Sequence, residues 1–262
     1  MLQQERLHRI RALLSHFKNI STERIMKELN ISRETARRDI IELEAMGEGK
    51  RVHGGIVAIE PVNQEAPLTQ RYQHMAKEKR SIVRKAVELL KSGQSIFIDA
   101  GSTTSMLAEE LRTMSGLTIV TNSIQAVMNL TLADENESPQ HEIILIGGRI
   151  FNRPQTQGDF TIAEIQKFTV DIALLSPVGL NANFGASSFY SEEALIAQSM
   201  SRQAKQTFIL ADSSKIGVSS RICYASCQEI NTIISNDDIE KHPEFESIRL
   251  KNKNIEIHLC PK

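Results

Sequence analysis

The sequence predicts an α/β protein with two domains: an N-terminal winged helix-turn-helix and a C-terminal domain with a mainly parallel sheet. First, two helical patterns lie two residues apart and are followed by a basic hairpin pattern. Second, seven short β-rich runs alternate with helical patterns after residue 93. Third, periodicity is lost between residues 60 and 76. We therefore expect a DNA-binding domain at 1–58, a linker at 59–75 and an effector domain at 76–262.

The first elements are three helices. Residues 3–17 carry Leu7, Ile10 and Leu14 at the spacing of one buried stripe, which predicts the first helix. A second short helix is predicted at 21–29. Only Asn30 and Ile31 separate it from Ser32, a good N-cap for a third helix at 31–47. Two helices joined so tightly are typical of a helix-turn-helix.

The third helix has two different faces. On a wheel of about 100° per residue, Ile40 lies within roughly 40° of Ala36, whereas Arg37 and Arg38 lie roughly 100–200° away. Gly47 stands where the helix is expected to end. The same pattern is found on ordinary surface helices with a solvated charged face, so the following segment decides between the two interpretations.

That segment is GEGKRVHGGIVAI, in which a glycine pair, Gly54 and Gly55, separates two short runs and predicts a hairpin turn. A basic hairpin after a helix-turn-helix is a wing, and its charges would meet DNA phosphates beside the groove. The predicted DNA-binding residues are Ser32, Arg33, Glu34, Thr35, Arg37, Arg38, Lys50, Arg51 and His53.

The C-terminal domain is expected to begin with a helix at 77–91. The seven β-rich runs that follow are SIFID, LTIVT, EIILI, DIALLS, TFILA, NTIIS and IEIHL. Short strands with intervening helices indicate a mainly parallel sheet covered on both faces. DENESPQH at 134–141 is expected to be an acidic surface loop.

Small polar residues follow most of these strands. Parallel sheets bind ligands beyond the carboxyl ends of their strands. The turn DAGSTT at 99–104 offers hydroxyls and backbone amides to an anion, although it could also be a simple strand-to-helix turn. The similar turn at 121–123 and the cation at 215 favour a phosphate-bearing ligand. The predicted effector-binding residues are Asp99, Gly101, Ser102, Thr103, Thr104, Thr121, Asn122, Ser123, Gly147, Gly148, Arg149, Gly179, Asp212 and Lys215.

These motifs resemble the DeoR family of bacterial sugar-responsive transcription regulators over essentially the whole chain. The N-terminal resemblance rests on Ile31, Ser32, Thr35, Arg37, Arg38, Asp39, Leu43, Gly47, Arg51, His53, Gly54 and Gly55. The C-terminal resemblance rests on EKRSIV (78–83), IFIDAGSTT (96–104), IVTNS (119–123), LIGG (145–148), Gly158, Gly179, Glu193-Ala194 and ADSSKIG (211–217).

The resemblance implies a fold for the effector domain that is similar to ribose-5-phosphate isomerase, and it adds Glu193 to the effector-binding residues. It also implies a repressor of a carbohydrate or polyol operon, released by a phosphorylated sugar, that forms a homodimer or homotetramer through this domain. The chain departs from the family at Ser102, where Thr is common, and at Ser176, where Gly is common. Pro177 beside it is unusual and fixes the backbone there, so the ligand's identity does not carry over.

The charge of the whole chain does not indicate a DNA-binding protein, and only the N-terminal part has a small excess of basic residues. The net charge is −1, yet residues 1–60 hold 11 Lys/Arg and 9 Asp/Glu, and the remainder hold 20 and 23. With no apolar run of about 18 residues and a charged N-terminal segment, we expect a cytoplasmic protein without membrane contact. The spacing of Cys223, Cys227 and Cys260 favours reduced structural thiols. No cofactor or metal is expected.

Two other functions remain open from the sequence. Asp99, Asp159, Glu193, Asp212 and Lys215 could supply acid and base to a sugar-phosphate isomerase-like enzyme with a DNA-binding appendage. An architectural DNA-binding protein whose second domain only dimerises would show no response to small molecules. We expect a regulator without catalytic residues.

Overall fold

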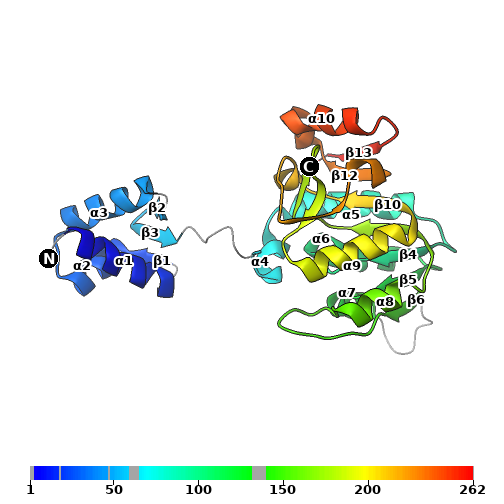
Figure 1. The fold of residues 1–262 in the computed structure, drawn as a ribbon, viewed down its shortest axis with the longest axis horizontal. Helices are drawn as coiled ribbons and strands as arrows, with labels where there is room; N and C mark the ends of the chain where they lie inside the picture. The colour runs from blue at the N-terminus through cyan, green and yellow to red at the C-terminus, as the bar shows by residue number, and fades with distance from the viewer. Residues whose placement is uncertain (1–2, 18, 47, 59–64, 132–139, 262) are drawn as a thin grey trace. The chain divides into compact units, whose positions relative to one another are not determined.

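The computed structural model describes residues 3–17, 19–46, 48–58, 65–131 and 140–261 (Figure 1). The chain divides into two compact units, Met1–Glu65 and Ala66–Lys262. Within the described residues, none of the helices combines the length and the apolar character needed to cross a membrane.

The first unit is a three-helix domain with a small sheet. Its elements are α1 (Gln3–Phe17), β1 (Asn19–Ser21), α2 (Thr22–Leu29), α3 (Arg33–Ala45), β2 (Gly49–Val52) and β3 (Gly55–Ala58), with sheet order β1-β3-β2. The apolar stripe predicted on α1 is buried with Ile25, Ile40 and Leu43 in one core. The predicted helix-turn-helix and hairpin are therefore confirmed. Gly47, expected at the end of the third helix, lies outside the described residues.

Capping fixes the turn between α2 and α3. The Ser21 and Ser32 hydroxyls accept hydrogen bonds from Arg24 N–H and Thr35 N–H, at 3.1 and 3.2 Å. Between the helices, Asn30 adopts the left-handed conformation with φ 51°, and its N–H donates to Met26 O. The end of α2 and the start of α3 are thus set by local hydrogen bonds.

The hairpin turn differs by one residue from the predicted glycine pair. Val52 pairs with Gly55, so His53 and Gly54 form the turn, and Gly54 has φ +86°. Gly55 lies in β3, where a Cβ would come 2.2 Å from Ile20 O. Gly54 is needed for its backbone angle, whereas Gly55 is needed for the close approach of β1.

The second unit begins inside the predicted linker. Helix α4 (Leu68–Gln73) occupies part of 59–75 and belongs to this unit, while residues 59–64 lie outside the described part. Helix α5 (Ala76–Leu89) follows. The range 59–75 that was predicted as a linker thus includes a helix that belongs to the second unit. Part of the stretch without periodicity is therefore this short helix.

Seven parallel strands form the main sheet, as predicted. They are β4 (Ser95–Ile98), β5 (Thr118–Thr121), β6 (Glu142–Leu145), β7 (Val170–Leu175), β10 (Ala204–Leu210), β12 (Thr232–Asn236) and β13 (Glu256–Cys260). The order is β13-β12-β10-β7-β4-β5-β6, and every pair is parallel. The residues at 132–139, within or beside the predicted acidic loop, lie outside the described residues.

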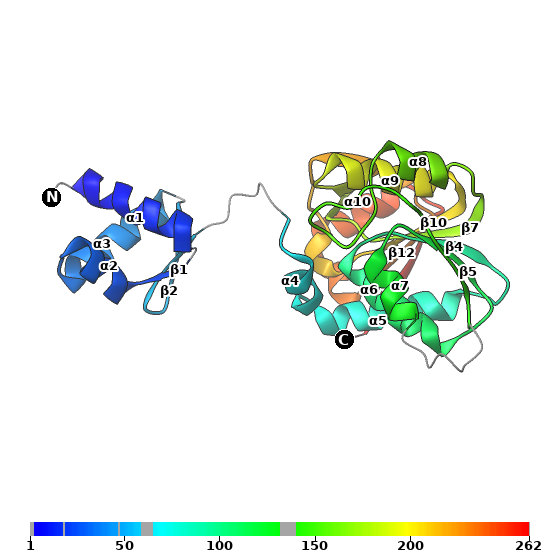
Figure 2. The same cartoon turned by 90° about the horizontal axis from the view of Figure 1, so that it is seen from below.

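Helices cover both faces of this sheet (Figure 2). Alternate residues of one strand point to opposite faces: Ile96 and Ile98 pack with α5, whereas Phe97 belongs to the other core. The first face is covered by α5, α6 (Ser102–Glu110) and α7 (Ile124–Leu130), and the second by α8 (Asp159–Ile165), α9 (Ser191–Arg202) and α10 (Pro243–Lys251). Short 3-10 turns lie at Leu111–Thr113, Ser213–Lys215, Cys227–Glu229 and Asp237–Lys241.

A second, three-stranded antiparallel sheet was not predicted. It contains β8 (Gly179–Asn181), β9 (Gly185–Ser188) and β11 (Ile222–Ala225) in the order β11-β9-β8. These segments are three or four residues long and rich in small residues, so they lack the alternation that identifies a strand. The main sheet is nevertheless as expected, and it brings its loops to one edge.

Candidate functional site

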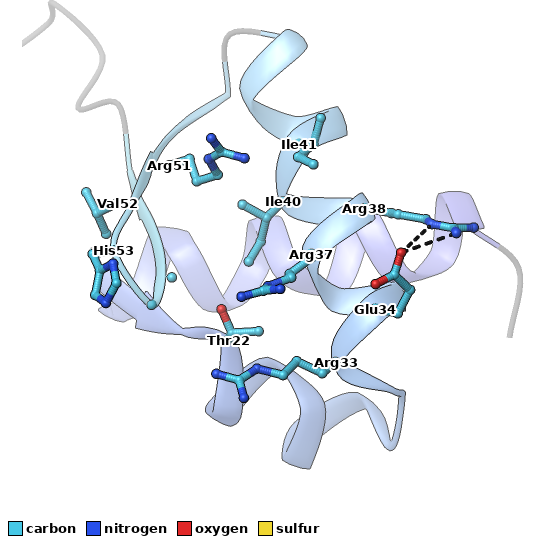
Figure 3. A pocket seen from close by; sticks show the side chains of 12 residues that line it. Thr22, Arg33, Glu34, Arg37, Arg38, Ile40, Ile41, Arg51, Val52 and His53 are labelled. Carbon is cyan, nitrogen blue, oxygen red and sulfur yellow. Dashed lines mark hydrogen bonds and ion pairs between the residues drawn. The ribbon is translucent and has the colours of Figure 1, made fainter.

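A groove of about 690 Å³ lies between α3 and the β2–β3 hairpin (Figure 3). The α3 side of the groove is amphipathic and the hairpin side is basic, as the sequence indicated. The groove is lined by Thr22, Arg33, Glu34, Arg37, Arg38, Ile40, Ile41, Arg51, Val52, His53, Gly54 and Gly55.

The arginines of α3 differ in their surroundings. Arg38 is held by Glu34, with its Nη2 3.3 Å from Glu34 Oε1, on the side of the helix away from the hairpin. Arg37 points toward the space beside the hairpin (Figure 3). Within the described part of the chain, Arg37 and Arg33 pair with no carboxylate. The groove therefore offers two uncompensated guanidinium groups.

Six of the nine predicted DNA-binding residues line the groove, and three do not. Ser32 and Thr35 are joined by a 2.8 Å hydrogen bond between their hydroxyls at the start of α3. Lys50 is exposed on β2 outside the groove. Ile41 and Val52 were not among the predicted residues, yet they line the groove with 49% and 39% of their surface exposed.

Two contacts hold α3 and the hairpin in place. Asp39 is fully buried and accepts from Arg6 Nε at 2.6 Å and from Arg6 Nη2 at 2.9 Å, which pins α3 to α1. Thr22 N–H donates to Gly54 O at 2.7 Å, which ties α2 to the tip of the hairpin. The groove is thus built on rigid elements rather than on a loop.

At the carboxyl edge of the main sheet, Asp99 organises the turn between β4 and α6. One carboxylate oxygen accepts from Ser176 N–H at 2.8 Å, and the other accepts from Gly101 N–H and from the Thr104 hydroxyl. Burial raises the pKa of Asp99 to about 6 despite these bonds. The Gly101 amide and the Thr104 hydroxyl were expected to face a ligand, but both are used to hold the turn.

Lys79 is the main residue that sequence analysis left out. Its side chain is 2% exposed, and its Nζ donates to Ser102 Oγ at 3.2 Å and to Arg71 O. Nζ also lies 4.0 Å from Asp212 Oδ2. Burial lowers the pKa of Lys79 to about 8, which Asp212 opposes and the nearby charge of Lys215 reinforces. The sequence could have indicated that Lys79 is buried, because it lies in the apolar stripe of α5.

The turns after β5 and β6 are held largely by their own hydrogen bonds. The Thr121 hydroxyl donates to Ile98 O, and Ser123 caps α7. Asn122 Nδ2 donates to Thr156 O at 2.9 Å. Thr161 donates to Gly147 O, whereas Gly148 and the exposed Arg149 continue into the loop toward α8. These turns lie beside the β4 turn because their strands are neighbours in the sheet.

Glu193 belongs to a polar cluster on the small-sheet side. Its Oε1 accepts from Arg153 Nη1 at 2.7 Å and from Gln155 Nε2 at 3.0 Å, and its Oε2 accepts from Ser188 Oγ. The negative charge of Glu193 contributes to the raised pKa of Asp99, so this cluster is close to the β4 turn. Gly179 begins β8, where a Cβ would meet Val218 O at 2.3 Å.

Three buried polar atoms around this edge lack a hydrogen-bond partner among the described residues: Asn122 Oδ1, Asp212 Oδ2 and Tyr224 Oη. The charge of Asp99 acts on Tyr224, whose pKa is raised mainly by burial. Buried polar groups are normally paired. The Asn122 and Asp212 oxygens can accept hydrogen bonds from hydroxyl groups, and Asp212 Oδ2 lies 4.0 Å from the Lys79 ammonium.

Solved structures resemble only part of the chain. Ribose 5-phosphate isomerase A from Methanocaldococcus jannaschii is 17% identical and covers 54% of this chain and 55% of its own, with a TM-score of 0.38. Ribose 5-phosphate isomerase A from Neisseria gonorrhoeae is 18% identical, with a TM-score of 0.38 over 55% of this chain and 54% of its own.

Comparison with sequence families and curated proteins covers nearly the whole chain. Residues 6–62 match the DeoR-like helix-turn-helix domain, and residues 74–237 match the DeoR C terminal sensor domain. The HTH-type transcriptional repressor GlcR of Bacillus subtilis is 32% identical, covering 90% of this chain and 89% of its own length. The HTH-type transcriptional regulator GlpR of Haloferax volcanii is 32% identical, covering 94% and 96%. The lactose phosphotransferase system repressor of Staphylococcus epidermidis is 29% identical, covering 94% and 98%. With a helix-turn-helix domain, a sensor domain and relatives named as transcription regulators, this chain belongs to the DeoR family of DNA-binding transcription regulators.

Proposed function

We propose that the protein represses a carbohydrate or polyol operon and leaves its operator when a phosphorylated sugar or polyol binds the sensor domain. The names of two relatives, a lactose phosphotransferase system repressor and the repressor GlcR, support both the sign of regulation and the link to carbohydrate. The observation that carries the proposal is that the positively charged side chain of Lys79 is buried beside the first turn of α6.

In the proposed DNA complex, α3 enters the major groove and the hairpin lies along the backbone. Arg37, which has no carboxylate partner in the described part of the chain, reads a base edge. Arg38 leaves Glu34 for a phosphate, which costs little because an exposed pair contributes about 0–1 kcal/mol. Arg51 and His53 contact phosphates from the hairpin.

In the proposed effector complex, the phosphate lies at the start of α6. The first amides of a helix have no acceptor within it, and the Ser102 hydroxyl already faces the Lys79 ammonium. Lys215 adds a second positive charge nearby. Asp212, Asn122 and Glu193 face sugar hydroxyls, because carboxylates in contact with the phosphate would repel it.

Release requires the ligand to prefer the state of the protein that binds DNA weakly. A preference of about 100-fold, or about 2.7 kcal/mol, is enough for a clear response.

We further propose that the protein acts in the cytoplasm, because a transcription regulator works on the chromosome. We also propose that it acts as a homodimer or homotetramer, because one short helix reads too few base pairs.

Calorimetric titration of the full-length protein with matched phosphorylated and free sugars tests the effector proposal. We expect heat only with a phosphorylated member, and Lys215→Ala should weaken binding while DNA affinity stays unchanged. Equal affinity for both members of every pair would contradict a phosphate site. Turnover of the sugar phosphate would indicate an enzyme. If none of the sugars or sugar phosphates changes the stability of the operator complex, the protein is architectural.

A further inference from the structure

An apolar side chain stands in the middle of the cationic face of α3. Ile40 and Leu43 are buried in the core, but Ile41 is 49% exposed and lines the groove. On the helical wheel Ile41 lies about 40° from Arg37 and about 60° from Arg38, so it lies between them. Val52, 39% exposed, lines the same groove from the hairpin.

We propose that Ile41 is a specificity-determining residue that contacts the methyl group of a thymine in the operator. The inference rests on the proposed entry of α3 into the major groove. Thymine is the base that presents a methyl there, and an aliphatic side chain recognises it by excluding water. Arginines surround Ile41, so the occupant that fits both the charge and the apolar centre is DNA.

The geometry also limits where this thymine lies. Ile41 is four residues beyond Arg37, and four residues of a helix span about 6 Å, or roughly two base-pair steps. If Arg37 contacts a guanine, the thymine methyl lies within about two base pairs of it. Val52 lines the hairpin side of the same groove and is not part of the proposed contact.

Uracil substitution tests this contact directly. Operator duplexes are first obtained by selection from random sequence with the full-length protein, and each thymine is then replaced by uracil, which removes only the methyl. At one thymine per half-site we expect the parent protein to bind about fourfold more weakly, equivalent to about 0.8 kcal/mol for one methyl. Ile41→Ala should bind the thymine and uracil duplexes equally.

Met46→Ala is the matched control, because Met46 has the same 49% exposure but lies outside the groove. It should keep the parent's preference for thymine. If no thymine shows a methyl effect that Ile41→Ala removes, although Arg37→Ala weakens binding, the inference is wrong and the proposed function stands. If selection enriches no sequence at all, the proposed function is wrong and this inference fails with it.

Discussion

Arg37 and Arg38 are adjacent in the sequence and yet meet different surroundings. Arg38 is paired with Glu34 one turn away, whereas Arg37 faces the groove beside the hairpin (Figure 3). An arginine that contacts a base edge gives the protein a sequence preference, whereas an arginine that contacts a phosphate adds affinity for any sequence. The two side chains can therefore be separated by experiment.

We expect Arg37→Ala to cost about 1–3 kcal/mol of operator binding and to relax preference at one base pair. Arg38→Ala should weaken all sequences evenly and reduce the slope of log affinity against log salt by about one. Binding titrations at several salt concentrations measure both. Arg9→Ala, on α1 and paired with Glu5, is the control. Unchanged operator affinity in both variants would rule out the assigned role of α3.

Lys79 gives the sensor domain a group that titrates close to physiological pH. Its pKa is about 8 because burial disfavours the ammonium form. The protonated form attracts a phosphate and the neutral form does not. A phosphate monoester has its second pKa near 6, so its own charge is constant above pH 7.

Affinity for a phosphorylated ligand should therefore fall as pH rises through about 8. Loss of a charged contact is worth about 1.5–3 kcal/mol. Calorimetry between pH 7 and 9 measures this change. Lys79→Met keeps much of the buried stem but carries no charge, so its weaker binding should vary little with pH. A parent protein with flat affinity over this range would exclude Lys79 from the site.

At the scale of elements, the turn between β4 and α6 is joined to the end of β7. Asp99 accepts from Ser176 N–H, and Gly101 packs so closely on Ser176 that a Cβ would lie 2.7 Å from the Ser176 Cβ and Oγ. The turn and the neighbouring strand end therefore cannot move independently. A change in one must be matched by a change in the other.

Gly101→Ala should displace Ser176, with a cost of about 1–3 kcal/mol from overpacking, and should impair release by the ligand. DNA affinity should be unchanged because the other unit carries the groove. Adding Ser176→Gly removes the obstructing side chain and should restore much of the response. Release assays on the single and double variants provide the measurement. A double variant no better than Gly101→Ala would mean that the Ser176 contact is not the cause.

At the scale of the whole molecule, DNA recognition calls for more than one copy of α3. A single short helix contacts a few base pairs, and a genome contains many competing sequences. The described part of the chain contains one helix-turn-helix. We therefore expect a second protomer to supply the missing discrimination.

We expect a footprint with two half-sites whose centres are one helical turn, about 10–10.5 base pairs, or a multiple of it apart. Footprinting together with light scattering at the same protein concentration tests this arrangement. A monomeric protein that protects one half-site would argue against it.

In the proposed mechanism, the DNA site and the ligand site act on each other reciprocally. If the ligand lowers operator affinity about 100-fold, operator DNA must lower ligand affinity by the same factor. Titrating ligand into the free protein and into the operator complex compares the two. Equal ligand affinities would mean that binding in the sensor domain does not cause release.

The sequence by itself determined the main helices and strands and the family. The helix-turn-helix follows from helical periodicity and the Ser32 cap, and the seven strands follow from short apolar runs, because these signals depend on residues close together in the chain. The turns at the carboxyl ends of the strands were also predicted. Their common edge follows from the parallel direction of the strands.

Only the tertiary structure decided which of these groups meet. The Lys79–Asp212 approach, the Asp99 bond to Ser176 and the pairing of β9 with β11 all join segments that are far apart in the sequence and carry no local signal of their contact. The same holds for Arg37 and Ile41, whose place opposite the hairpin depends on how α3 packs on α1. Burial and charge at a site come from packing between distant segments, and periodicity describes only one segment at a time.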